Sequence, residues 1–338
     1  MTFVTSSPRF DVVSLGDVAT DTFIRLPENI AREHSDESNR WLEIPLGAKF
    51  PYDREPTTVI GGSGSNTAVA LARLGLRVGL ASFLAHDHIG LDLLNSLHAE
   101  RIDTRLIHVD STVHTNQNFV LLFRGERTIL VRHEAFEYHW PHLRPSEIPA
   151  WLYLSSLGPN AFDYQDLIAD WLEENPRVKL AFQPGTYQIG AGVDRLARLY
   201  ARADVVLCSE SAAAALAGTG NLDHTKLLDA LLDLGCRCAV VWDERGAGAV
   251  SNRAERYRVP PFPDSSAPLD RTGVDDAFGA TFLSGLIRSL SLRDALRRPP
   301  VNVMSVSHEL GSQPGLLTEE QLAAHLDESD PPFEAVEF

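Results

Sequence analysis

Short apolar runs alternate with helix-like segments along most of this chain, and this alternation limits the possible folds more than any other feature. The runs are rich in Val, Leu and Ile, and they include FDVVSLG, VGLASFL, WLYLSSL, VKLAFQP, ADVVLCS and CAVVWDE. Such runs are typical of strands buried on both faces, and a helix between two of them gives a parallel connection. The sequence therefore predicts an α/β fold in which helices cover both faces of a mostly parallel sheet.

Two stretches interrupt this alternation, at about residues 22–58 and 113–140. In the second, FVLLF and RTILVRH flank Arg124-Gly125-Glu126, which is typical of a β-hairpin with a short glycine-containing loop. We expect both stretches to supply strands of a small second sheet, called the lid below. No repeat or linker is visible, so residues 1–330 are predicted to form one domain, followed by an acidic, poorly ordered tail at 331–338.

Composition excludes several classes of function. The 338 residues include 46 acidic and 30 basic ones, and the formal charge of −16 argues against nucleic acid as a partner. The 3 cysteines match neither a disulfide framework nor a zinc site. No apolar stretch approaches the roughly 18 residues of a membrane span, and the first residues lack a signal-peptide pattern. We expect a cytoplasmic protein that binds no membrane.

The segment VIGGSGSNTAVALARLGL is a first candidate binding motif. Its glycines precede a helix pattern that contains Val69 and Leu71 and ends near Gly75. Gly61 and Gly62 would let a ligand approach the backbone, while Asn66 offers a donor and an acceptor to a hydroxyl-rich molecule. The spacing matches neither a Walker A motif nor a dinucleotide-binding loop. The alternative is a tight turn that only starts a helix.

A second candidate is DRTGVDDAFGATFLSGL, where Gly273 opens a helix pattern and Asp275 and Asp276 fall in its first turn. A helix N-terminus presents unpaired amides and a partial positive charge, so it can hold a phosphoryl group. An aspartate there could accept a proton from an attacking hydroxyl. The alternative is ordinary helix capping, because acids are favoured at this position without any catalysis.

Taken together, the two motifs resemble the two signatures of the PfkB (ribokinase-like) carbohydrate kinase family, and the resemblance covers most of the chain. GDVATD at residues 16–21 is similar to the family's first-strand substrate motif. HDHIGLDLLNSL, QPGTYQ and NVMSVSHELGSQPGLLT are similar to further family segments in the family's order. The resemblance implies a ribokinase-like three-layer αβα sandwich with a mostly parallel central sheet and a small β-sheet lid.

The resemblance also implies the chemistry, which is transfer of the γ-phosphoryl group of ATP to a hydroxyl of a sugar or nucleoside. It implies Mg²⁺ as a cofactor, with a monovalent cation as a further candidate, and a homodimer formed through the lid. Asp276 would be the catalytic base. The other implied site residues are Gly273, Val274 and Asp275 in an anion hole, Asp17, Asp21, Gly61, Gly62 and Asn66 around the acceptor, and Thr272, Gly246 and Asn302 around the nucleotide.

This chain departs from the family pattern mostly on the nucleotide side. Asp275 replaces the second glycine of the anion hole, which puts a carboxylate and a Cβ where phosphates should arrive. The family's Asn-x-x-Glu motif, which organises magnesium, falls on Ser209 and Ala212. The glycine-rich nucleotide segment appears as Trp242-Asp243-Glu244-Arg245-Gly246, one residue short. The metal ligands are therefore not identified.

Two functions stay open. The first is an active sugar kinase, and the second is a degenerate member that binds a sugar or nucleoside as a regulatory or scaffold protein. An oxidoreductase that uses a nicotinamide cofactor is disfavoured, because no G-x-G-x-x-G follows the first strand. The spacing of the histidines matches no zinc site (His86, His88, His133, His139 and His142). Trp140 and Trp151 are expected in the core.

Overall fold

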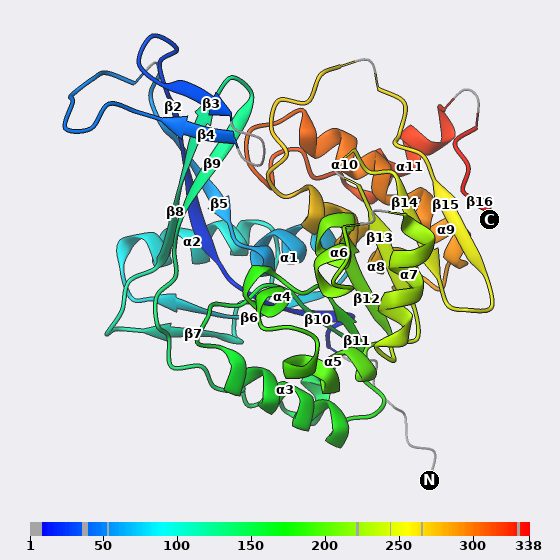
Figure 1. Ribbon diagram of the computed structural model, residues 1–338. Coiled ribbons are helices and arrows are strands. Elements are labelled where there is room, and N and C mark those ends of the chain that lie inside the picture. Colours follow the sequence, from blue (N-terminus) through cyan, green and yellow to red (C-terminus); the bar gives the residue numbers. More distant parts are fainter. Residues whose placement is uncertain are drawn as a thin grey trace.

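The computed structural model of the chain describes residues 9–35, 40–52, 54–220, 223–243, 245–264, 266–329 and 332–338 (Figure 1). Its centre is a sheet of ten strands in the order β16-β15-β14-β13-β12-β11-β10-β1-β6-β7. The strands from β13 to β7 in this order pair in parallel, and β14, β15 and β16 add antiparallel pairs at one edge. The expected mostly parallel sheet is confirmed.

The strands of this sheet are short. Their bounds are Val12–Leu15 (β1), Val78–Ala85 (β6), Ile107–Asp110 (β7), Trp151–Leu154 (β10), Lys179–Phe182 (β11), Val205–Ser209 (β12), Ala239–Trp242 (β13), Gly248–Ser251 (β14), Arg256–Val259 (β15) and Val336–Glu337 (β16). The six apolar runs that the sequence singled out supply β1, β6, β10, β11, β12 and β13.

Alternate residues of each central strand point into two separate apolar cores. In β1, Val12 packs in one core with Tyr153 of β10, whereas Val13 and Leu15 pack in the other with Leu154. This period of two is what a strand buried on both faces requires. Helices cover both faces of the sheet, so the three-layer αβα architecture is confirmed (Figure 1).

The helices on the first face are α1 (Ser63–Arg73), α2 (His88–Ala99), α8 (Val274–Ile287), α9 (Leu292–Arg297) and α10 (Pro299–Ser307), with α11 (Glu319–Asp327) packed behind α10. Those on the second face are α3 (Phe162–Glu174), α5 (Ala197–Arg202), α6 (Glu210–Leu216) and α7 (His224–Asp233), with the short α4 (Thr186–Gly190) near α6. Trp151 is buried in the first core, and Trp140 packs against the second, as expected.

The lid is a separate four-stranded sheet in the order β5-β2-β8-β9, and it rises beside the main sheet in Figure 1. Its strands are β2 (Ala19–Arg25), β5 (Thr57–Gly61), β8 (Asn116–Phe123) and β9 (Glu126–Arg132), and a two-stranded hairpin of β3 (Arg32–Ser35) and β4 (Arg40–Glu43) accompanies it. The expected hairpin is present, and Arg124 and Gly125 form its tight turn with positive φ angles of 51° and 82°. The domain boundaries stay a prediction.

The C-terminal segment differs from the poorly ordered tail that its acidic sequence predicted. Phe333 and Ala335 are buried, and β16 pairs with β15 at the edge of the main sheet. Arg297 also donates a hydrogen bond to the carbonyl oxygen of Phe333. The apolar residues between the acids anchor this segment, so for residues 332–338 the expectation was wrong. Of the helices in the described ranges, none combines the length and apolar character needed to cross a bilayer.

Candidate active site

The candidate site lies at the carboxyl ends of the parallel strands, where α/β sheets usually bind ligands. Asp17 follows β1, Ser156 follows β10 and Gln183 follows β11. Ser209 and Trp242 end the neighbouring strands β12 and β13. Segments from five strands therefore converge on one edge of the sheet, and the N-termini of α1 and α8 meet there.

Asp276 occupies the first turn of α8, and its side chain is buried. Burial is the main reason that the pKa of this carboxyl is raised to about 7; the negative charges of Asp275 and Asp21 contribute to the rise, and hydrogen bonds from Asn66 and Ser63 oppose it. A carboxyl with a pKa near 7 exchanges a proton readily at neutral pH, which is what a general base requires.

Asn66 links the two motifs. Its Nδ2 donates to Oδ2 of Asp276 at 2.8 Å, and its Oδ1 accepts from Nε2 of Gln313 at 3.0 Å. The amide of Asn66 is thus already engaged within the protein, and one remaining N–H is left for an acceptor molecule. The sequence placed Asn66 at the acceptor, and the structure adds that it orients Asp276. Gln313 was missed, although it lies in the quoted segment GSQPG.

The glycine loop lies directly against β1. Gly62 has a φ of +93°, and a Cβ on it would lie 2.5 Å from the carbonyl oxygen of Asp17. The amide of Gly64 donates to that same oxygen at 2.9 Å. This close approach requires glycine, so part of the motif has a structural role that is independent of any ligand.

Asp21 and Asp17 lie on the acceptor side. Asp21 is buried on β2, and it accepts a hydrogen bond of 2.9 Å from Asn118, its neighbour on β8. Burial raises its pKa. Burial also raises the pKa of Asp17 to about 7, and Oδ2 of Asp17 lies 3.5 Å from Nδ1 of His133. These carboxyls offer acceptors for sugar hydroxyls, and Asn118 and His133 were not found from the sequence.

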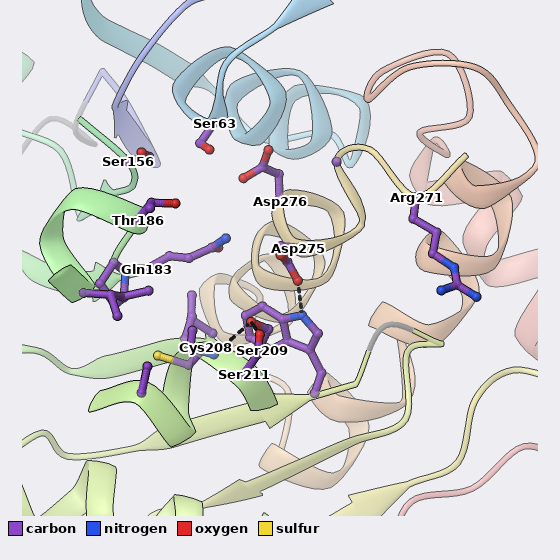
Figure 2. A pocket seen from close by; sticks show the side chains of 18 of the residues that line it. Ser63, Ser156, Gln183, Thr186, Cys208, Ser209, Ser211, Arg271, Asp275 and Asp276 are labelled. Carbon is purple, nitrogen blue, oxygen red and sulfur yellow. Dashed lines mark hydrogen bonds between the residues drawn. The ribbon is translucent and has the colours of Figure 1, made fainter. Parts of the chain in front are cut away.

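A cavity of about 470 Å³ opens onto Asp276. Figure 2 shows Asp275 and Asp276 on α8, with Ser63, Ser156, Gln183, Thr186, Ser209 and Ser211 arranged around them. A second cavity of about 700 Å³ shares Asp275, Trp242 and Ser209 with the first and extends under the lid toward Arg25 and Leu269. The two cavities therefore adjoin each other at the start of α8.

Asp275 is accessible from the cavities, and its Oδ1 accepts a hydrogen bond of 2.7 Å from the indole Nε1 of Trp242, drawn in Figure 2. The surrounding protein raises the pKa of Asp275, and this hydrogen bond opposes the rise. Trp242 is itself buried and stacks on Phe278 with ring centroids 4.6 Å apart. Asp275 lies inside α8 and is not among the residues with positive φ, so its backbone conformation is one that any residue adopts without strain.

Two of the expected nucleotide-binding residues lie elsewhere. Asn302 is fully buried: its Nδ2 donates to Thr281, and its Oδ1 accepts from the amide of Leu317. Gly246 is buried against Pro300 and Val303 of α10. Each residue packs α10 against its surroundings, and its contact with a nucleotide stays a prediction. Glu244 lies outside the described residues.

The remaining predicted residues lie close to the cavities. Gly273 lines the first and Val274 the second. Thr272 donates its hydroxyl to Oδ1 of Asp270 at 2.8 Å, which holds the loop before α8 in place. Ser209 and Ala212, on which the family's magnesium motif was expected to fall, line the first cavity. In the described part of the chain, no three His, Cys, Asp or Glu side chains gather closely enough to hold a metal ion.

A family model described as pfkB family carbohydrate kinase matches residues 48–307. The chain belongs to this family. A relative from Lacticaseibacillus casei, 5-dehydro-2-deoxygluconokinase, is 23% identical over 338 residues, which cover 95% of this chain and 97% of the relative. A ribokinase from Haemophilus influenzae is 25% identical over 244 residues, which cover 70% of this chain and 77% of the relative.

Solved structures agree with the ribokinase fold. Arabidopsis thaliana ribokinase, solved with ribose and ATP, superposes with a TM-score of 0.77 at 16% identity, covering 95% of this chain and 99% of that one. A nucleoside kinase from Methanocaldococcus jannaschii superposes with a TM-score of 0.75 at 14% identity, covering 96% of this chain and 100% of that one. At these identities the structures show the fold alone, so the substrate has to be argued from the site.

Proposed function

We propose that this pfkB-family protein transfers the γ-phosphoryl group of ATP to a hydroxyl of a sugar or related small molecule, with Asp276 as the base. One observation carries the proposal: the buried carboxyl of Asp276 lies in the first turn of α8, at the edge of a cavity, and has a pKa of about 7. A merely capping aspartate is usually exposed, with its pKa near or below the normal value.

The proposed step is an in-line displacement. The acceptor oxygen attacks the γ-phosphorus, the bond from that phosphorus to the bridging oxygen breaks, and ADP leaves. The proton of the hydroxyl passes to Oδ1 or Oδ2 of Asp276. Asn66 holds the carboxyl in place through its 2.8 Å hydrogen bond, so little reorganisation is needed when the proton arrives.

The acceptor would lie between the lid and α1. Asp21 and Asp17 would accept hydrogen bonds from its hydroxyls, and the remaining N–H of Asn66 would donate one. The lid strands above it would exclude water, which otherwise competes as an acceptor. Relatives named for ribose and for a keto-deoxy acid are similar to this chain, and neither name decides its substrate.

The phosphates of ATP would meet the N-terminus of α8, where the first-turn amides have no helical carbonyl partner. The residues present fit a magnesium ion held mainly by phosphates and water, with Ser209, Ser211 and the cavity-lining carboxylate of Asp275 around it. Bound there, Mg²⁺ would neutralise charge on the phosphates. A monovalent cation stays a prediction.

The rival is a non-catalytic member that binds a sugar or nucleoside, and the observation that favours it is Asp275. A carboxylate at the mouth of the anion hole opposes the arrival of phosphates. Two measurements separate the functions: calorimetric titration with ATP, with and without Mg²⁺, and a phosphotransfer screen over ribose, fructose, 5-dehydro-2-deoxygluconate and adenosine. ADP formation that depends on one acceptor supports the kinase. Acceptor binding without turnover supports the rival.

A further inference from the structure

We propose that Arg127, on the lid strand β9, is a second catalytic residue of the transfer, and that its guanidinium contacts the phosphoryl group as it moves from ATP to the acceptor. The inference rests on the proposed kinase function. It adds a residue that neither the glycine loop nor the α8 motif contains, and it gives the lid a chemical role besides covering the acceptor.

The position of Arg127 is the first argument. Its side chain lines both the cavity of about 470 Å³ that reaches Asp276 and the cavity of about 700 Å³ that reaches Leu269 and Pro268. Asp275 lines both cavities as well. The proposed base lines the first cavity, and Asp275 lies in the first turn of α8, where the phosphates would arrive, so Arg127 lies beside the path of the transferring group.

Electrostatic reach gives the second argument. The positive charge of Arg127 lowers the pKa of Asp21, which lies on the acceptor side, and it also lowers the pKa of Asp275, which lies on the nucleotide side. Coulomb interactions inside a protein fall off with distance, so a charge that acts on both carboxylates lies within reach of both. Burial remains the larger influence on both acids, and it acts in the opposite direction.

Spare hydrogen-bond donors give the third argument. A guanidinium carries five N–H donors. Among the described residues, the side chain of Arg127 has one acidic partner, Oδ1 of Asp270, at a distance of 3.4 Å, which is long for a hydrogen bond. Asp270 does not need this partner, because its carboxylate already accepts from Thr272 and from the amide of Gly311. Most of the donors of Arg127 are therefore available to a ligand.

The chemistry of the site creates a need for such a cation. In the transition state, negative charge spreads over the three equatorial oxygens of the transferring group. Asp275 adds a negative charge beside them, at a position where the family has a glycine. A planar guanidinium can bind two phosphate oxygens at once, and its charge offsets that of Asp275. The positive charge of Arg127 would thus compensate for the extra negative charge of Asp275.

The test compares Arg127→Gln with Arg127→Lys, and uses Arg132→Gln as the control. Arg132 lies on the same strand, is 60% exposed and pairs with Glu134 at 2.5 Å. Its odd spacing of five residues from Arg127 puts it on the other face of β9. Turnover is measured with ATP and the most active acceptor among ribose, fructose, 5-dehydro-2-deoxygluconate and adenosine. Binding of ATP and of ADP is measured by calorimetry.

We expect Arg127→Gln to lower kcat by roughly 10²-fold or more, the range found when one transition-state donor is removed, with the acceptor KM within about threefold. Arg127→Lys should recover about tenfold of that loss, because lysine restores the positive charge but cannot bind two phosphate oxygens as a planar guanidinium does. Arg132→Gln should have the kcat and the acceptor KM of the unchanged protein. A kcat loss below about fivefold in Arg127→Gln, or a rise in acceptor KM at unchanged kcat, would overturn the proposal.

The calorimetry separates this inference from the proposed function. If the unchanged protein transfers no phosphate to any acceptor, the kinase assignment fails, and ATP binding alone tests Arg127. A guanidinium that contacts the γ-phosphate should make Arg127→Gln bind ATP about tenfold more weakly and ADP equally well, since one charge-assisted contact is worth about 1.5 kcal/mol or more. If Arg127→Gln weakens the binding of ATP and ADP equally, or leaves both affinities unchanged, the result counts against the contact.

Discussion

The side-chain amide of Asn66 donates a hydrogen bond of 2.8 Å to Oδ2 of Asp276, although 210 positions separate the two residues in the sequence. At the other end of the same amide, Nε2 of Gln313 donates a hydrogen bond of 3.0 Å to Oδ1 of Asn66. The glycine loop, the α8 motif and the C-terminal loop are therefore joined in one buried chain of hydrogen bonds. This chain fixes the orientation of Asp276 before any acceptor binds.

Asp276→Asn should preserve the fold and the affinity for the acceptor while lowering kcat by roughly 10²-fold or more, because the amide is nearly isosteric but cannot accept the proton. Steady-state kinetics with ATP and the best acceptor measure this. A loss below tenfold removes Asp276 from the role of base. Asp275→Asn is the control: a larger loss there would show that the register of the α8 motif is wrong by one residue.

The rate should depend on pH through Asp276. Its pKa of about 7 means that the base is half protonated at neutral pH, and a protonated carboxyl cannot accept the hydroxyl proton. We therefore expect kcat/KM to fall about tenfold per unit as the pH drops below about 7, and to level off above it. The measurement is a pH profile from about 5.5 to 9. A profile that is flat across this range would contradict the assignment.

Much of the fold could be predicted from the sequence, because its signals are local. The buried strands read as continuous apolar runs, and the hairpin at Arg124 and Gly125 as a glycine-containing turn. The tail was the exception: buried Phe333 and Ala335 stand among acids, and no local pattern shows that they pair with β15. An isolated apolar residue shows nothing about its distant partner.

The site was predictable only in part, for a related reason. Asp21, Asn66 and Asp276 lie in motifs with recognisable spacing, and they do converge. Gln313 and Arg127 reach the site through contacts with residues more than 100 positions away, which no spacing rule contains. No spacing rule shows that Thr281 and the backbone amide of Leu317 engage the two ends of the Asn302 side-chain amide.

Asp21→Ala should weaken acceptor binding by about 1 to 3 kcal/mol, the cost of leaving a buried polar partner unpaired, with ATP binding nearly unchanged. Isothermal titration of acceptor and ATP separates the two effects. Asn66→Ala should in addition shift the pH profile upward, because removing a donor to the charged form of Asp276 raises the pKa of that carboxyl. Reduced ATP affinity with intact acceptor affinity would contradict this division of the site.

We predict that two copies pair through the lid. Strand β9 is the edge of the lid sheet, and it exposes Ile129, Leu130 and Val131 at 41%, 54% and 54%. An unpaired edge with apolar side chains is a natural pairing surface. Leu130→Glu should shift a dimer toward monomer in sedimentation, whereas Leu167→Glu on α3, which is 46% exposed, should not. An unchanged chain that sediments as a monomer at high micromolar concentration rules out the dimer.

Asp275→Gly decides what the extra carboxylate does. If Asp275 only repels phosphates, glycine should improve ATP binding by about fivefold or more without Mg²⁺, since a like charge a few ångströms away costs about 1 kcal/mol even in water. If Asp275 is a metal ligand that replaces the carboxylate missing at Ala212, glycine should abolish the gain in ATP affinity that Mg²⁺ gives.

The two results have opposite signs, and we expect the first. Oδ1 of Asp275 is already occupied by Trp242 at 2.7 Å, which leaves one oxygen for a cation, and a helical backbone here needs no glycine. Asp275→Asn is the matched variant, because it removes the charge but can keep the hydrogen bond from Trp242. Equal gains in ATP affinity in Asp275→Gly and Asp275→Asn would show that the negative charge causes the effect. ATP affinity that stays flat in both, with no turnover in any protein, would leave the non-catalytic binding function standing.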